Sequence, residues 1–180
     1  MNSRRPVNSH GSVAFLMNAN IPTVRRIAWL YTVPHLLVMF GLILLLWTVK
    51  FRNNFNLAIL YGALGYLVYS FGSKAFLLRH HRRGINLSKL GLFPEAISEF
   101  QSSYSFLSKY SWIDKYRFLT MLDSSAIPYR EMALCNVAFS YAQVDEKSRA
   151  EEFYRKAMEE FPESDLAKTG LEYVESGKRK

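Results

Sequence analysis

The sequence predicts an all-α protein in which a two-helix transmembrane hairpin precedes a short α–α superhelical domain. Two long apolar segments, residues 27–49 and 55–73, contain no Asp, Glu, Lys or Arg. From Leu77 onward the pattern changes to amphipathic helix, turn and amphipathic helix. The predicted organisation is a basic N-terminal tail (1–26), the hairpin (27–74), a helical domain (77–176) and a basic C-terminal tail (177–180).

The lengths of the two apolar segments predict the hairpin. A helix crosses the hydrocarbon core of a bilayer with about 20 apolar residues, and the segments have 23 and 19 residues. Only residues 50–54 separate them. Because unpaired backbone is not tolerated in lipid, so short a polar connection must turn the second helix back alongside the first.

Small residues on the second segment predict where the two helices touch. They recur at spacings of four, three and seven residues, which places them on one stripe of a helix and lets another backbone approach closely. We predict that the first segment packs on this stripe, and a second copy of the protein is the alternative. The stripe consists of Ala58, Gly62, Gly65 and Gly72.

The distribution of charge predicts the orientation. Residues 1–130 carry 15 Lys and Arg against 4 Asp and Glu, a net +11, whereas residues 131–180 carry 8 against 11, a net −3. Four arginines precede the first segment and four basic residues follow the second, against two in the connection. This positive-inside pattern predicts both termini and the helical domain in the cytoplasm, and the inverted topology is the alternative. A basic membrane half joined to an acidic soluble half does not indicate a nucleic-acid binder.

The composition of the N-terminal 26 residues is compatible with localisation in either of two membranes. The apolar run begins too late and is too long for a secretory signal peptide. We therefore expect an integral protein of a bacterial cytoplasmic membrane. The Arg- and Ser-containing, acid-free composition of the tail is shared with mitochondrial transit peptides, so a mitochondrial membrane is the alternative.

The helical domain contains two segments in which small and large residues recur in one order. Residues 131–164 match at every position that we compared, and residues 77–110 match at Gly84, Leu87, Gly91, Ala96 and Phe100 but depart at Arg83, Ser103 and Ser108. This order resembles the tetratricopeptide repeat (TPR). The matching positions of the second segment are Leu134, Val137, Ala138, Tyr141, Ala150, Tyr154, Ala157 and Pro162.

The resemblance implies two antiparallel helix pairs, an insertion at 111–130 and a capping helix at 165–176. It also implies a groove, lined by the first helix of each pair, that holds a protein or peptide partner. The protein would then be a membrane-anchored TPR scaffold for protein–protein interaction at the cytoplasmic face. The matching groove positions are His81, Ile85, Ser88 and Lys89 in the first repeat and Asn136, Phe139 and Gln143 in the second.

Two repeats are fewer than the three or so that usually bury a continuous core, so we also expect a homo-oligomer or an obligate complex. The insertion places Trp112, Ile113, Tyr116, Leu119 and Leu122 at helical spacing, which predicts an extra helix followed by a loop. Its aromatic face either packs on the repeats, which we favour, or forms a binding surface.

The sequence offers no motif for catalysis. His80 and His81 have no Cys, Asp or Glu nearby at metal-ligand spacing, and the single cysteine, Cys135, has no neighbouring histidine to activate it. We therefore expect no enzyme, no metal and no cofactor. In an alternative hypothesis the hairpin is the working part, as a small subunit of a transporter or membrane enzyme. His35, the one titratable group in the apolar segments, is then the residue of interest.

Overall fold

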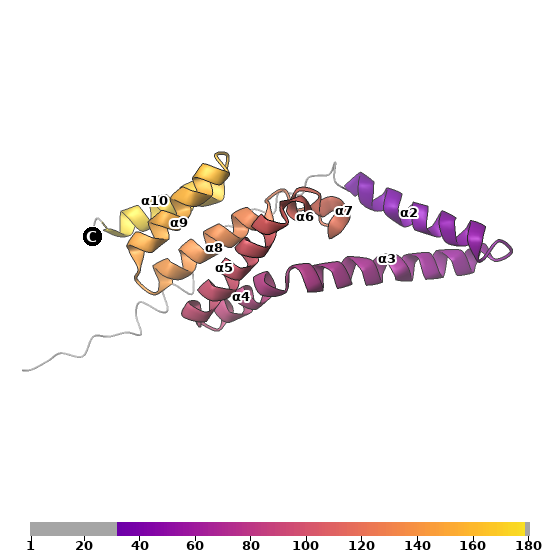
Figure 1. Cartoon of the computed structure of the whole chain (residues 1–180), viewed down its shortest axis with the longest axis horizontal. Coiled ribbons are helices and arrows are strands. Elements are labelled where there is room, and N and C mark those ends of the chain that lie inside the picture. The colour runs from indigo at the N-terminus through magenta and orange to yellow at the C-terminus, as the bar shows by residue number, and fades with distance from the viewer. Residues whose placement is uncertain (1–31, 179–180) are drawn as a thin grey trace, which may run out of the picture.

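The computed structural model describes residues 32–178, and every helix or strand assigned there is an α-helix (Figure 1). The all-α prediction is therefore confirmed for this range. The basic tail 1–26, residues 27–31 of the first apolar segment and residues 179–180 lie outside the described residues. The helices are α2 (Thr32–Val49), α3 (Phe55–Leu77), α4 (Arg79–Lys89), α5 (Phe93–Lys109), α6 (Ser111–Lys115), α7 (Arg117–Thr120), α8 (Tyr129–Gln143), α9 (Lys147–Glu160) and α10 (Asp165–Lys178).

The two apolar segments form α2 and α3, which the predicted turn connects (Figure 1). Helix α3 extends four residues beyond the predicted end at Ser73 and reaches Leu77. Among the described helices, α3 alone is both long and apolar enough to cross a membrane. Helix α2 is apolar but shorter in the described range, so the first predicted span, residues 27–49, stays a prediction.

Helices α2 and α3 touch near their connecting turn. A Cβ atom at Gly62 would lie 2.6 Å from the Cγ1 atom of Ile43 and 3.0 Å from its Cα atom, so only glycine allows this approach. Ala58 is fully buried one turn earlier, and a Cβ at Gly65 would meet Leu42 at 3.3 Å. Gly72 lies away from this contact and is exposed, because the helices diverge toward its end of α3 (Figure 1).

The helical domain is built from two antiparallel pairs, α4–α5 and α8–α9, followed by α10. Helix α4 follows α3 after a break at Leu78. The turn between α4 and α5 contains Gly91 at φ +75°, a left-handed conformation that glycine adopts without strain. Pro94 stands in the first turn of α5, where its missing N–H costs no helical hydrogen bond.

Small residues of the domain receive large ones. A Cβ at Gly84 of α4 would lie 2.7 Å from the ring of Phe100, which is buried in α5. The same relation holds between Gly170 of α10 and Tyr154 of α9. Such pairs bring helix axes close together and fill the space beside the contact. The other small residues of this core, Ala96, Ala138 and Ala150, are fully buried.

The last helix begins with a side-chain cap. The backbone N–H of Ala167 donates a hydrogen bond of 3.0 Å to the Oγ atom of Ser164, the arrangement of an N-cap. Helix α9 ends at Glu160, just before Pro162. Helix α10 packs on α9 and α8 and continues to Lys178, two residues beyond the predicted end.

The insertion forms two short helices, α6 and α7, that break at Tyr116, where the sequence predicted one helix. Ile113 and Met121 are buried in a second small core with Leu78 and Leu107. Trp112, Tyr116 and Leu119 remain exposed, and Leu122 is buried. The insertion therefore packs on the domain through some of its apolar residues only.

Candidate functional site

The two helices that carry the predicted groove residues lie parallel to each other. The ring of His81, at the start of α4, meets the ring of Tyr129, at the start of α8, with centroids 5.4 Å apart. Just after the end of α4, the ring of Phe93 meets Phe139, in the second half of α8, at 6.2 Å. Contacts at both ends in the same order require a parallel arrangement, which Figure 1 shows.

Six of the seven predicted groove residues reach the surface at least partly. Lys89 is exposed and forms no salt bridge with the part of the chain that the structure describes. Phe139 packs edge-on against Phe93 and keeps part of its ring accessible. Half-buried side chains complete the set: Ile85, Ser88, Asn136 and Gln143.

His81 is the exception, because its side chain is only 3% exposed. Its ring packs at a steep angle against both Phe100 and Tyr129, and burial lowers the pKa of His81 to about 4. His81 therefore belongs to the core and cannot line an accessible groove. The sequence contained the signal, since His81 precedes Gly84 by three residues and so shares the face on which Gly84 receives Phe100.

The other titratable groups near the predicted groove do not form a reactive or metal-binding site in the described residues. The Nδ1 atom of His80 lies 2.7 Å from a carboxylate oxygen of Glu99 in α5. Cys135 is buried, and burial raises the pKa of its thiol to about 12, which disfavours the nucleophilic thiolate. Among residues 32–178, no group of three or more His, Cys, Asp and Glu side chains could hold a metal ion.

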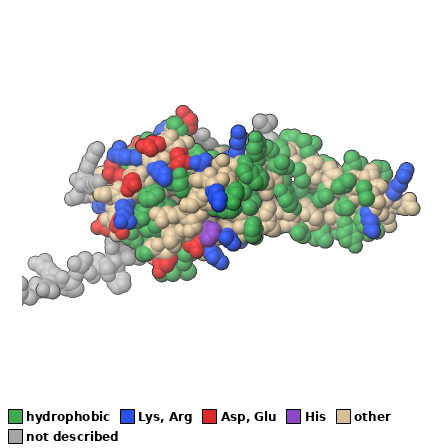
Figure 2. All heavy atoms as spheres, viewed as in Figure 1, with side chains coloured by type: hydrophobic (Ala, Val, Ile, Leu, Met, Phe, Trp, Pro, Cys, Tyr) green, Lys and Arg blue, Asp and Glu red, His purple; other side chains and the backbone are tan. Residues whose placement is uncertain are grey.

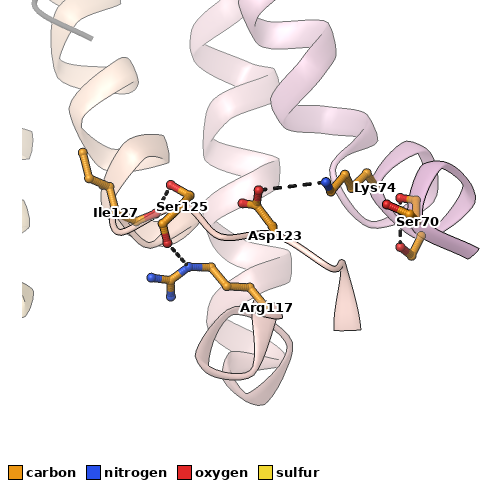
Figure 3. Close-up of polar contacts among 7 residues, drawn as sticks. Ser70, Lys74, Arg117, Asp123, Ser125 and Ile127 are labelled. Atoms are coloured by element: carbon orange, nitrogen blue, oxygen red, sulfur yellow. Dashed lines mark hydrogen bonds and ion pairs between the residues drawn. The ribbon is translucent and has the colours of Figure 1, made fainter. Parts of the chain in front are cut away.

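A second candidate site lies where the insertion meets the hairpin. Helix α7 contacts α2, and the hydroxyl of Tyr69 in α3 lies 3.1 Å from the carbonyl oxygen of Leu119 and 3.3 Å from that of Thr120. The Lys74 amino group lies 4.0 Å from a carboxylate oxygen of Asp123 (Figure 3). We call this region, where α7 and residues 121–123 meet α2 and α3, the junction.

Side chains of the insertion satisfy its own backbone. The guanidinium of Arg117 donates hydrogen bonds to the carbonyl oxygens of Asp114, Ser125 and Ala126, at 2.9–3.1 Å, and Figure 3 shows it directed at Ser125. The hydroxyl of Thr120 lies 2.8 Å from the carbonyl oxygen of Ile113. These bonds hold an irregular segment in one conformation.

Asp114 is a structural residue that the sequence analysis missed. Its carboxylate, 3% exposed, accepts hydrogen bonds from the backbone N–H groups of Tyr129 (2.9 Å) and Arg130 (3.0 Å). These are the first two N–H groups of α8, and Pro128 before them has no polar side chain. Asp114 thus caps α8 from α6, and a separation of 15 residues gives no sequence signal for such a cap.

We compared the chain with protein-family models, curated proteins and solved structures, and none of them matches it. The TPR resemblance therefore rests on the residues named above.

Proposed function

We propose that the protein is a membrane-anchored scaffold whose helical domain binds a protein or peptide partner at the cytoplasmic face of a membrane. The observation that carries the proposal is an exposed apolar helix that leads directly into the parallel α4–α8 surface. Only 11% of the apolar window of α3 is buried, whereas the core helix of a soluble domain hides its apolar side chains. The break at Leu78 separates α3 from the first helix of that surface.

The helices of the proposed anchor lie at one end of the molecule, apart from most of its charged side chains. Hydrophobic side chains gather along the α2–α3 part with basic side chains at its tip, and charged side chains of both signs gather on the α9–α10 end (Figure 2). The 23 residues of α3 rise about 34 Å, enough for a hydrocarbon core of about 30 Å. In the proposed arrangement the first apolar segment, which contains α2, is the other span, and both termini lie in the cytoplasm.

The α4–α8 surface has the chemistry of a peptide site. Phe139 offers an aromatic ring, Lys89 offers a cation, and Asn136 and Gln143 offer amides on one helix. An extended peptide with an apolar side chain and an acidic group would satisfy all three kinds of contact. Aromatic residues in partly covered positions carry much of the affinity in such interfaces, so we assign the main contribution to Phe139.

The test is a comparison of copurified proteins from mild detergent. The tagged full-length chain is compared with the variant Lys89→Glu, Phe139→Ala and Gln143→Ala, and with the control Lys168→Glu and Tyr173→Ala, which alters exposed residues of α10. The proposal expects a partner that the groove variant loses and the control keeps, while both remain membrane-bound and helical. A partner set that is unchanged in the groove variant would refute the proposal.

One observation favours the hairpin as the working part instead. The Nε2 atom of His35 in α2 is buried and has no hydrogen-bond partner in the described range, and its ring lies beside the backbone of Phe118. A small membrane subunit of a transporter or enzyme complex would depend on such a group. Loss of function on His35→Ala, with full function in the groove variant, would support this second candidate.

A further inference from the structure

Most of the exposed large apolar side chains of the helical domain lie in the insertion or directly before it. Seven such residues follow Leu77 in the described range, and four of them lie within ten residues of one another. Their exposed fractions lie between 39% and 56%. A soluble surface does not usually concentrate such residues unless something covers them. The four are Tyr110, Trp112, Tyr116 and Leu119.

The junction fixes the depth of this cluster relative to the hairpin. Tyr69, whose hydroxyl contacts the carbonyl groups at the end of α7, stands eight residues before the end of α3 at Leu77. Eight residues of helix rise about 12 Å. Helix α7 therefore lies beside the last turns of the apolar helix. If α3 crosses a bilayer with Lys74, which pairs with Asp123, among the headgroups, Tyr69 stands about 7.5 Å below it in the hydrocarbon core. The junction then spans the boundary between the core and the headgroups.

The exposed surface of α3 continues to the same level. Phe71 and Phe76 of α3 are 73% and 68% exposed, on either side of Lys74, which pairs with Asp123 of the junction. The apolar surface of the hairpin and the aromatic cluster of the insertion therefore meet at one depth along α3.

The hydrogen bonds and lysines of the insertion are those expected of a segment at a membrane interface. Seven hydrogen-bond contacts from the side chains of Tyr69, Arg117 and Thr120 reach carbonyl oxygens of residues 113–126. A segment with little access to water needs such internal partners for its backbone. Lys109 and Lys115 hold their amino groups 5.4 and 5.5 Å from the rings of Tyr110 and Tyr116. Lysines beside amphipathic rings are typical of an interface between lipid and water.

We propose that the insertion is an interfacial membrane element, with Trp112, Tyr116 and Leu119 at the boundary between the headgroups and the hydrocarbon core of the bilayer that α3 crosses. The occupant of the exposed surface is lipid, because the surface lies at the depth of exposed Phe71 and Phe76 of α3 and lysines lie beside its rings. The inference rests on the proposed membrane anchor. It assigns to the insertion the task of fixing the height and tilt of the helical domain on the membrane.

The test uses the three tryptophans of the chain, Trp29, Trp47 and Trp112, in lipid nanodiscs. The variant Trp29→Phe with Trp47→Phe leaves only Trp112. The control adds Trp112→Phe and Tyr173→Trp, which moves the reporter to exposed Tyr173 of α10. A third variant, Trp29→Phe with Trp112→Phe, keeps Trp47 as a reporter of the hairpin. Lipids brominated near the headgroup quench a ring in the interface, and iodide quenches a ring in water.

We expect bromolipid to reduce the Trp112 emission at least twofold and iodide to have little effect, with the reverse for the reporter at 173. Iodide quenching of Trp112 equal to that at 173, without bromolipid quenching, would overturn the inference. Shielding of Trp112 from both quenchers would also overturn it, because protein would then cover the surface.

The Trp47 reporter separates the two proposals. If bromolipid quenches Trp47 but not Trp112, the anchor stands and the interfacial insertion is refuted. If neither is quenched, both fail. Should Trp47→Phe disturb the contact of Trp47 with Phe55, the comparison of the unaltered chain with Trp112→Phe gives the same answer without that change.

Discussion

Asp114 shows how one buried carboxylate holds two helical elements together. Because it accepts bonds from the first two N–H groups of α8, its removal leaves two donors unsatisfied and detaches α6 from α8. We expect Asp114→Ala to lower the free energy of unfolding by about 1–3 kcal/mol. Asp114→Asn should cost less, because the amide keeps one acceptor oxygen.

Unfolding of the full chain in detergent, followed by circular dichroism, measures this effect. The matched control is Glu163→Ala, which removes an exposed carboxylate just before α10 and should change stability by no more than about 0.5 kcal/mol. Equal stabilities of Asp114→Ala and Glu163→Ala would show that the cap contributes nothing.

His81 should make the domain sensitive to acid. Burial lowers its pKa to about 4 in the folded protein from 6.5, so below pH 6.5 the unfolded chain binds a proton that the folded chain does not. Stability is therefore full above pH 6.5 and falls as the pH decreases toward 4, by about 3 kcal/mol in all. Burial raises the pKa of Glu131, which acts in the opposite direction.

The difference between the unaltered chain and His81→Phe isolates the histidine from Glu131. Urea unfolding at pH 7, 6, 5 and 4.5 should show the unaltered chain losing stability relative to His81→Phe as the pH falls. Parallel stability curves for the two chains across this range would contradict the assignment of His81 to the core.

At the scale of elements, the α2–α3 contact depends on Gly62. A Cβ there would lie 2.6 Å from the Cγ1 atom of Ile43, so we expect Gly62→Leu to separate the helices and to cost about 1–3 kcal/mol. Gly72 provides the matched control, because a Cβ there meets nothing within 4 Å in the described part of the chain. The measurement is the melting temperature in nanodiscs, where Gly72→Leu should match the unaltered chain. Equal destabilisation by both substitutions would refute the contact.

The same elements show what the sequence could predict. The resemblance to the tetratricopeptide repeat implied two antiparallel helix pairs, which α4–α5 and α8–α9 form. Its large residues Phe100, Tyr141 and Tyr154 are buried. The helical spacing of the insertion did not predict its break at Tyr116. There the side chains of Arg117 and Asp114 form hydrogen bonds with groups on other segments. Such tertiary hydrogen bonds produce no periodic pattern in the sequence. Gly72 does not pack on the described part of α2 for a similar reason, because α7 contacts α2 at the end where α2 and α3 diverge.

At the scale of the whole molecule, the parts are arranged along one axis. The hairpin lies at one end, the charged α9–α10 end at the other (Figure 2), and α7 of the junction between them (Figure 1). The junction joins α3 to residues 50 positions later in the chain, so the helical domain is attached to the hairpin at more than the break at Leu78. We infer that the α4–α8 surface is held at a fixed height above the proposed membrane.

Cysteine labelling tests the orientation that this arrangement requires. Asn53→Cys places a thiol in the turn between α2 and α3, and Tyr173→Cys places one on α10, at the charged end. Cys135 should not interfere, because it is buried and burial raises its pKa to about 12. In intact bacterial cells, we expect an impermeant maleimide to label the cysteine at 53. The cysteine at 173 should react only after the membrane is opened.

The unaltered chain, which should stay unlabelled, is the control for this experiment. The reversed pattern would establish the inverted topology and place the α4–α8 surface outside the cell, where a cytoplasmic partner could not reach it. Labelling of both positions from outside would mean that α3 does not separate them across a bilayer. Since α3 is the helix whose length and exposed apolar surface support the anchor, that result would refute the membrane scaffold as a whole.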